Sequence, residues 1–329
     1  MGQRVITYSR NVFLPITTVC RNRCDYCCFR TPVQEDCILR AEDVTETLIR
    51  GARLGCTEAL FTFGERPGDV LGFDACLRDL GYSDILGYCH DLCRKSIAIG
   101  LLPHTNAGIL TYEELEYLRP VNASMGLMLE TTAEVPAHQR SPGKKPETRI
   151  EMIENAGKLR IPFTTGLLLG IGENMEDRED SLTVIRDIDR RYGHIQEVII
   201  QNFTPKTGIP MALFPPLESE EICVVIRMAK EILPDNIAIQ VPPNLVNAGN
   251  LIPCGVDDLG GVSPVTIDYI NPEHPWPEMD SLRAMVGHDY LKERLCIYPR
   301  YIEKRWYPET LEPLIKRLDQ DMRERERCT

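Results

Sequence analysis

The feature of this chain that most restricts its fold is an alternation of short β-branched or aromatic runs with amphipathic stretches of about ten or more residues. This alternation is typical of βαβ units, which build a parallel sheet. Eight strands can be placed in this way, and that number suits a complete (β/α) barrel of the TIM type, an α/β fold. Strands are predicted at 11–18, 57–63, 97–102, 122–129, 162–169, 195–201, 236–241 and around 262–269.

Four of the intervening stretches carry apolar residues at helical spacing with acidic residues near their starts, as helices prefer. These predicted helices are 41–54, 146–159, 175–191 and 218–232. After about residue 265 the sequence is broken by prolines and ends in a charge-laced amphipathic helix. We therefore expect a barrel over 1–265 and a C-terminal extension over 266–329 that packs on it, with a functional lid as the alternative role for the extension.

Charge and composition exclude several classes of partner. The formal net charge is -12, and no run of Lys or Arg is long enough to follow a phosphate backbone, so nucleic acid is not an expected partner. Arg4 and Arg10 interrupt the apolar residues of the N-terminus, and no later stretch approaches the roughly 20 apolar residues of a membrane span. The expected location is the cytoplasm, with no membrane partner. The 13 cysteines are odd in number and irregularly spaced, which indicates metal binding in a reducing compartment more than a disulfide framework.

Three of the cysteines follow the first predicted strand as CxxxCxxC, namely Cys20, Cys24 and Cys27. A structural zinc ion normally takes four protein ligands, and neither Cys28 nor Cys37 has the spacing to supply the fourth. Three thiolates on a 4Fe-4S cluster instead leave one iron open to bind the amino and carboxylate groups of S-adenosylmethionine. A zinc site or a chance cluster is the alternative.

The remaining cysteines have no partner spacing, and we predict that they behave as small buried apolar residues. They are Cys56, Cys76, Cys89, Cys93, Cys223, Cys254, Cys296 and Cys328.

The cysteine spacing, with Tyr26 directly before the third cysteine, resembles the radical S-adenosylmethionine superfamily. The resemblance implies that S-adenosylmethionine is cleaved to methionine and a 5'-deoxyadenosyl radical. It also implies that Phe63, Gly64 and Glu65, after the second strand, correspond to the Gly-Gly-Glu motif that binds the methionine amine. The first Gly is replaced here, so Phe63 contributes only through its backbone.

Further residues are assigned to S-adenosylmethionine on the same resemblance. Glu130, after the fourth strand, would accept hydrogen bonds from the ribose hydroxyls. Arg149, 19 residues later, would pair with the methionine carboxylate, and a surface ion pair is its alternative role. The segment GLLLGIGE resembles the part of the superfamily that packs backbone against adenine, here through Gly170 and Ile171. Tyr26 and Asn106 are assigned to the same ligand.

Other polar residues fall near predicted strand ends, where the chemistry of a parallel barrel collects. We predict that they bind a polar, weakly charged substrate, although each is also a common turn residue. They are His104, Gln201, Asn202, Asn244, Asp257 and Asp258.

A narrower resemblance covers most of the chain, to about residue 277. The segments TYSRNVFLPITTVCRNRCDYCCF, TFGERP, LLPHTNAGIL, TPKTGIPM and DDLGGVSPVTIDYINPEHPWP are similar to the CofG-type family of 7,8-didemethyl-8-hydroxy-5-deazariboflavin synthases. The resemblance implies a lyase that abstracts a hydrogen atom from an adduct of ribityluracil with a tyrosine-derived 4-hydroxybenzyl group. The deazaflavin ring then closes with loss of ammonia.

The same resemblance implies an external electron donor and a possible CofH-type partner subunit, which would make the adduct. S-adenosylmethionine would be consumed as a co-substrate. The alternatives are the CofH-type 4-hydroxybenzyl transferase itself, another related radical enzyme such as one of the aminofutalosine pathway, and a non-catalytic metal-binding scaffold.

Overall fold

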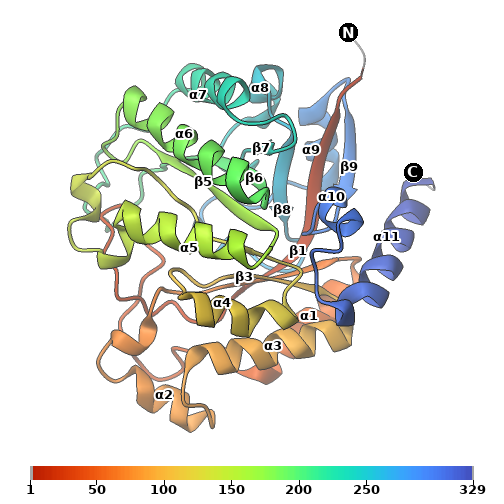
Figure 1. Cartoon of the computed structure of the whole chain (residues 1–329). Coiled ribbons are helices and arrows are strands. Elements are labelled where there is room, and N and C mark those ends of the chain that lie inside the picture. The colour runs from red at the N-terminus through yellow and green to blue at the C-terminus, as the bar shows by residue number, and fades with distance from the viewer. Residues whose placement is uncertain (1–2, 328–329) are drawn as a thin grey trace.

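The computed structural model describes residues 3–327, and across them eight parallel strands close into a barrel (Figure 1). Each strand pairs with the next along the chain, and β1 pairs with both β2 and β8, which closes the ring. The predicted (β/α) barrel is confirmed. The strands are β1 (Val5–Pro15), β2 (Glu58–Thr62), β3 (Leu102–Asn106), β4 (Ser124–Gly126), β5 (Phe163–Leu169), β6 (Ile195–Asn202), β7 (Ala238–Gln240) and β8 (Asp258–Val262).

Helices surround the barrel, and the four predicted ones end within two residues of their expected bounds. α6 shows the local cause, because the Asn174 side chain accepts from the N–H of Glu176 and of Asp177 and so caps the first turn. No helix within residues 3–327 is long and apolar enough to cross a membrane. The helices are α1 (Ala41–Arg53), α2 (Phe73–Asp79), α3 (Ile85–Ile99), α4 (Tyr112–Leu118), α5 (Pro146–Lys158), α6 (Met175–Tyr192), α7 (Ser219–Ile232) and α8 (Ala248–Leu251).

Two strand predictions were misplaced. Residues 97–102, predicted as one strand, belong to two elements. α3 is capped by Asp84 and continues to Ile99, and Gly100 then ends the helix with a φ of 108°. β3 begins only after that glycine. The last strand was expected around 262–269, but β8 covers Asp258–Val262, whose first residue is a buried carboxylate and not part of an apolar run.

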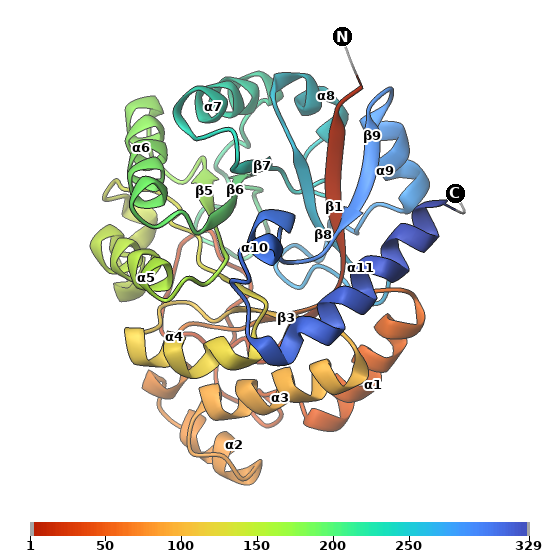
Figure 2. The same cartoon turned by 45° about the vertical axis from the view of Figure 1, so that its right-hand side comes forward.

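The C-terminal residues complete the amino end of the barrel. A ninth strand, β9 (Tyr290–Arg294), pairs in parallel with Val5–Ser9 of β1. After α9 (Met279–Val286) and β9, Leu295, Ile297 and Tyr301 form a buried cluster with the underside of the barrel. In Figure 2, α10 (Pro299–Glu303) lies in front of the barrel ring and α11 (Glu312–Arg327) crosses beside it. The part of the predicted extension 266–329 from β9 onward is therefore built into the barrel base, whereas the segment just after β8 lies at the opposite end.

A buried ionic network joins this extension to the barrel interior. The Arg294 guanidinium is 7% exposed and donates to Glu197 Oε2 at 2.7 Å and to Asp258 Oδ2 at 2.6 Å. The Tyr298 hydroxyl donates to the same Glu197 oxygen at 2.9 Å. Burial raises the pKa of Glu197, which the guanidinium partly offsets. Two carboxylates inside the barrel thus depend on one arginine.

One prediction about the cysteines was wrong. Cys223 of α7 and Cys254 form a disulfide across 31 residues of sequence, although their spacing suggested no partner. Cys56, Cys89, Cys93 and Cys296 are buried free thiols, as expected, while Cys76 is partly exposed. Cys328 lies outside the described residues.

A buried histidine away from the cavity should make the protein sensitive to acid. His194 is fully buried, its Nε2 lies 2.9 Å from the Ile153 carbonyl, and burial lowers its pKa to about 4. The unfolded chain takes up a proton below about pH 6.5, while the folded chain does so only near pH 4. Its contribution to stability is therefore complete above pH 6.5 and is lost as the pH falls towards 4, by up to about 1.4 kcal/mol per pH unit.

We expect His194→Gln to flatten the fall in unfolding free energy between pH 6.5 and 5, as measured by urea unfolding. His288→Gln, at an exposed position, is the control and should leave the slope unchanged. An unchanged slope in His194→Gln would contradict the assignment.

Candidate active site

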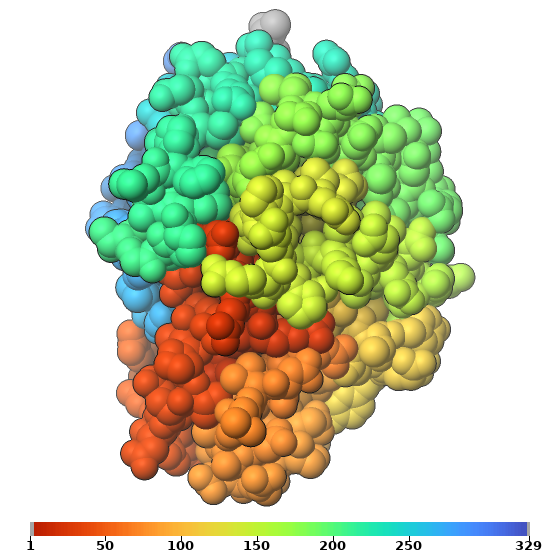
Figure 3. All heavy atoms as spheres, turned by 90° about the vertical axis from the view of Figure 1, so that its left-hand side faces the viewer, coloured from red at the N-terminus to blue at the C-terminus, as the bar shows by residue number. Residues whose placement is uncertain are grey.

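A cavity of about 220 Å³ opens at the carboxyl end of the barrel. Figure 3 views the molecule from the left-hand side of Figure 1, and there the red N-terminal part of the chain lies between yellow-green and teal surfaces from later segments. Twelve of the predicted site residues line this cavity. They are Cys20, Cys24, Tyr26, Cys27, Phe63, Gly64, Glu65, Asn106, Glu130, Arg149, Gln201 and Asn202.

The cysteine loop is held against the segment between β4 and α5 by backbone hydrogen bonds. The N–H of Arg23 donates to the Arg140 carbonyl at 3.2 Å, and that of Asp25 donates to the Ala137 carbonyl at 3.1 Å. The Arg140 guanidinium also pairs with Asp25 at 2.6 Å. The position of the three thiols is therefore fixed by a segment more than 100 residues away in the sequence.

The thiols suit a polynuclear cluster. The Cys20 sulfur accepts from the N–H of Glu65 and the Cys24 sulfur accepts from the Ser141 hydroxyl, both at 3.2 Å, and such bonds stabilise a thiolate. Within residues 3–327 no three Cys, His, Asp or Glu side chains converge on a position for a single metal ion. Three thiols from one loop line the same cavity, and three thiolates are a donor set that fits a 4Fe-4S cluster with one iron left open.

Burial affects the thiols before any metal binds. It raises the pKa of Cys20 to about 11 and also raises the pKa of Cys24. Cys28 lines the same cavity, but its thiol donates to the Ile270 carbonyl at 3.3 Å. That bond holds the Cys28 side chain toward the segment after β8, which favours Cys27 over Cys28 as the third ligand.

The turn after β2 requires glycine. A Cβ on Gly64 would lie 2.0 Å from the Val19 carbonyl oxygen, so only glycine lets this turn approach the cysteine loop. The next side chain, Glu65, is 5% exposed and pairs with Arg21 at 3.1 Å. Its other oxygen lies 3.7 Å from the guanidinium of Arg149.

Glu130 occupies the centre of a buried polar network. One carboxylate oxygen accepts from the Tyr26 hydroxyl and lies 3.1 Å from His138 Nε2, while the other accepts from the Lys144 ammonium. Burial would raise the pKa of Glu130, but Lys144, Arg149 and His138 hold it well below its usual range. Its φ of 69° is the left-handed conformation that non-glycine residues rarely adopt, as often seen at functional sites.

Arg149 of α5 is 3% exposed, which rules out the surface ion pair considered as its alternative role. Its guanidinium donates to the carbonyls of Met128 at 2.6 Å and Gly143 at 2.9 Å. The remaining nitrogen lies 3.6 Å from Glu130. These bonds aim the guanidinium into the space between the two acidic residues.

Gly170 and Ile171 do not line the cavity, although Leu168 of the same segment does. Their N–H groups donate to the Glu173 carboxylate at 2.7 and 2.8 Å, and Glu173 pairs with Arg178 at 2.8 Å. Glu173 therefore holds the backbone of the turn after β5 in place.

Four predicted substrate residues lie outside the cavity, and His104 and Asn244 are two of them. His104 lies in the middle of β3, 7% exposed and with Nδ1 2.7 Å from the Ser124 hydroxyl, because β3 starts later than predicted. Asn244 donates to Asp268 at 2.9 Å and to the His274 carbonyl at 3.1 Å, so it braces the segment after β8.

Asp257 and Asp258 were predicted at a strand's carboxyl end, and this placement was wrong. They stand at the start of β8, at the opposite end of the barrel. Asp257 pairs with Lys230 at 3.0 Å, and Asp258 belongs to the Arg294 network. Their polar groups serve the barrel base and do not reach the cavity.

Sequence reasoning missed several residues of the site. Ser141 contacts Cys24, Lys144 and His138 contact Glu130, and Lys206 lines the cavity wall after β6. Three of the four lie in the segment between β4 and α5, which has no periodicity. The available signal was their position 8 to 14 residues after Glu130 in the loop that follows the same strand.

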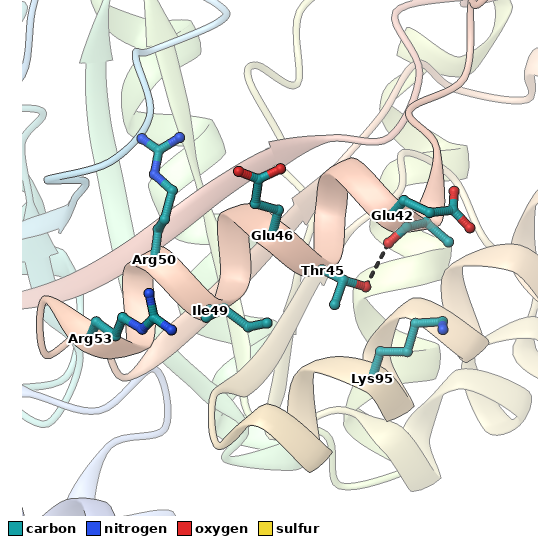
Figure 4. Close-up of a pocket in the computed structure, with 8 residues that line it drawn as sticks. Glu42, Thr45, Glu46, Ile49, Arg50, Arg53 and Lys95 are labelled. Carbon is teal, nitrogen blue, oxygen red and sulfur yellow. Dashed lines mark hydrogen bonds between the residues drawn. The ribbon is translucent and has the colours of Figure 1, made fainter.

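A second hollow, of about 520 Å³, lies outside the barrel between α1 and α3 (Figure 4). Its rim carries exposed side chains of both charges, including Glu46, Arg53 and Lys95. None of the predicted site residues lines it, so the cavity at the carboxyl end is the candidate active site.

Comparison with known proteins agrees with this geometry. The family model of the radical SAM superfamily, the superfamily of radical S-adenosylmethionine enzymes, matches residues 14–185, which include the cysteine loop, Glu65, Glu130 and Arg149. The chain therefore belongs to the radical SAM superfamily.

Curated relatives narrow the assignment. The chain is 65% identical to the 7,8-didemethyl-8-hydroxy-5-deazariboflavin synthase of Methanoculleus marisnigri, over 97% of this chain and 96% of the relative. It is 62% identical to the enzyme of the same name from Methanosphaerula palustris, over 99% of each chain. Within the superfamily, the chain belongs to the family of 7,8-didemethyl-8-hydroxy-5-deazariboflavin synthases, as predicted.

Solved structures share the fold at low sequence identity. The FeFe-hydrogenase maturase HydG from Carboxydothermus hydrogenoformans aligns with a TM-score of 0.65 at 16% identity, covering 90% of this chain and 68% of the other. Methylornithine synthase aligns with a TM-score of 0.61 at 18% identity, covering 97% and 82%. These likenesses support the barrel architecture.

Proposed function

We propose that this enzyme cleaves S-adenosylmethionine at a 4Fe-4S cluster held by Cys20, Cys24 and Cys27, and that it acts on the ribityluracil adduct that carries the 4-hydroxybenzyl group. Hydrogen abstraction from the adduct leads to closure of the deazaflavin ring with loss of ammonia. The observation that carries the proposal is the convergence of the three thiols with Glu65, Glu130 and Arg149 on one cavity of a chain that belongs to the synthase family.

The cluster, when bound, supplies the electron that cleaves the sulfonium of S-adenosylmethionine. The residues of the chain bind and orient that ligand. The turn at Gly64 offers backbone acceptors to the methionine amine, and the Arg149 guanidinium is aimed to pair with the carboxylate. Glu130 faces the ribose.

The Glu130 carboxylate already has hydrogen-bond partners in the chain without ligand. Its oxygens already meet Tyr26, His138 and Lys144, and the Arg149 guanidinium lies 3.6 Å away. A carboxylate has about four acceptor sites, so a ribose diol has to replace one of these donors. Lys144 is the donor whose long, flexible side chain can most readily move.

The cavity wall at the end of β6 and just after it suits the ribityluracil adduct. Gln201, Asn202 and Thr204 present amide and hydroxyl groups there, and Lys206 adds one cation. Such groups can pair with the uracil and ribityl parts of the adduct. The proposal also includes an external one-electron donor and, as the source of the adduct, a CofH-type partner.

An anaerobic assay tests the proposed function. The protein is reconstituted with iron and sulfide, reduced, and supplied with S-adenosylmethionine with and without the adduct. We expect 5'-deoxyadenosine in both cases and the deazaflavin only with the adduct, read by chromatography and deazaflavin fluorescence. Deazaflavin intermediates formed only from tyrosine plus the diaminouracil would assign the chain to the transferase, and no iron-dependent absorbance would contradict the cluster.

A further inference from the structure

Ser141 contacts one of the three cysteine thiols through its side chain. It lies between two short 3-10 helices, Pro136–His138 and Pro142–Lys144, and is 3% exposed. Its hydroxyl donates to the Cys24 sulfur at 3.2 Å, within the range allowed for a sulfur acceptor. Because Ser141 is buried, water cannot readily replace this bond.

The hydroxyl is oriented by a second hydrogen bond. The N–H of Arg23, in the cysteine loop, is shared between two acceptors, the Arg140 carbonyl at 3.2 Å and Ser141 Oγ at 3.1 Å. This bond occupies a lone pair of the oxygen and leaves the hydroxyl proton directed at Cys24. The backbone is fixed as well, since the N–H of Ser141 donates to the His138 carbonyl at 2.9 Å.

The three sulfurs differ in their donors. Cys20 accepts from the backbone N–H of Glu65, which a change of side chain, other than to proline, leaves in place. Among the hydrogen bonds of the described residues 3–327, Ser141 supplies the side-chain donor to these three sulfurs. It is therefore the donor that can be deleted by mutation while the three cysteines stay in place.

We propose that Ser141 is a positioning residue that raises the reduction potential of the cluster by its hydrogen bond to Cys24. Reduction adds negative charge to the cluster and its sulfurs, and a hydrogen bond to a sulfur stabilises the more negative state more strongly. The electron comes from the external one-electron donor of the proposed function, on which this inference rests.

Potentiometric titration followed by electron paramagnetic resonance tests the inference on the reconstituted full chain. We expect Ser141→Ala to shift the midpoint to a more negative value, by up to about a tenfold change in the reduction equilibrium, which is about 59 mV for one electron. Ser141→Thr keeps the hydroxyl and should restore the midpoint towards that of the wild type. Ser96→Ala, which removes a buried serine hydroxyl bonded to the Leu101 carbonyl far from the cysteine loop, should leave the midpoint unchanged.

The signal reports only chains that carry the cluster, so a lower iron content in Ser141→Ala does not obscure the result. A midpoint equal to that of the wild type, together with a lower melting temperature, would show that Ser141 only braces the loop and would overturn the inference. If the wild-type chain itself takes up no cluster, the proposed function fails instead.

Discussion

Replacing Cys24 with alanine is expected to abolish the cleavage of S-adenosylmethionine, to below the detection limit for 5'-deoxyadenosine. The three thiols lie around one cavity, and the loop that carries them is tied to residues 137–141 by backbone bonds that do not involve the thiol groups. Removing one thiol should therefore delete a cluster ligand without unfolding the loop. The measurements are iron per chain, the visible absorbance of the reconstituted protein and the yield of 5'-deoxyadenosine.

Cys28→Ala is the matched control for this prediction. Cys28 lines the same cavity, but its thiol is bonded to the Ile270 carbonyl. This variant should keep its iron and at least a large part of its cleavage activity. Loss of cleavage in Cys28→Ala, with cleavage retained in Cys27→Ala, would make Cys28 the third ligand in place of Cys27. Equal loss in Cys24→Ala and Cys28→Ala would mean that the loop and not the thiol is required.

The second large effect concerns stability. Arg294→Met should lower the free energy of unfolding by about 3–5 kcal/mol near neutral pH, because it leaves Glu197 and Asp258 buried without their cation. Urea unfolding followed by circular dichroism measures the change. Arg190→Met, at a side chain that is 66% exposed, should leave the stability within experimental error.

A triple variant separates charge from packing and remains informative if Arg294→Met does not fold. Adding Glu197→Gln and Asp258→Asn to Arg294→Met removes the two carboxylates that the single change leaves unpaired. We expect this variant to regain most of the lost stability. A triple variant as unstable as Arg294→Met would show that the side-chain packing of Arg294, including its stacking 4.5 Å from the Tyr298 ring centre, carries the effect.

The sequence predicted those parts of the fold that depend on local patterns. Helices α1, α5, α6 and α7 repeat their apolar residues at helical spacing, and strands β5 and β6 are short runs rich in apolar and β-branched residues. β8 and β9 could not be found in this way. β8 begins with Asp258, and β9 reads YLKER, so both contain charges whose neutralising partners lie tens of residues away.

In the candidate site too, the residues in local motifs were predicted, and those placed by distant contacts were not. The motif residues of the cysteine loop, of the turn after β2 and of the end of β4 came together as predicted. His138, Ser141 and Lys144 were missed because their segment has no regular period, and its place in the site is set by hydrogen bonds to the cysteine loop. The disulfide between Cys223 and Cys254 was missed for a related reason, since only the packing of α7 brings the two sulfurs together.

The pairing of β1 with β9 has a consequence for biosynthesis. β1 leaves the ribosome before the other strands of the barrel, and its carboxyl end leads directly into the cysteine loop. The strand that pairs with its amino half, and the residues that close the barrel base, are synthesised some 280 residues later. During translation, the strand that leads to the cysteine loop therefore lacks its final neighbour until about 280 further residues have been made. Insertion of the proposed cluster would then wait until β9 has been made and the barrel base can close.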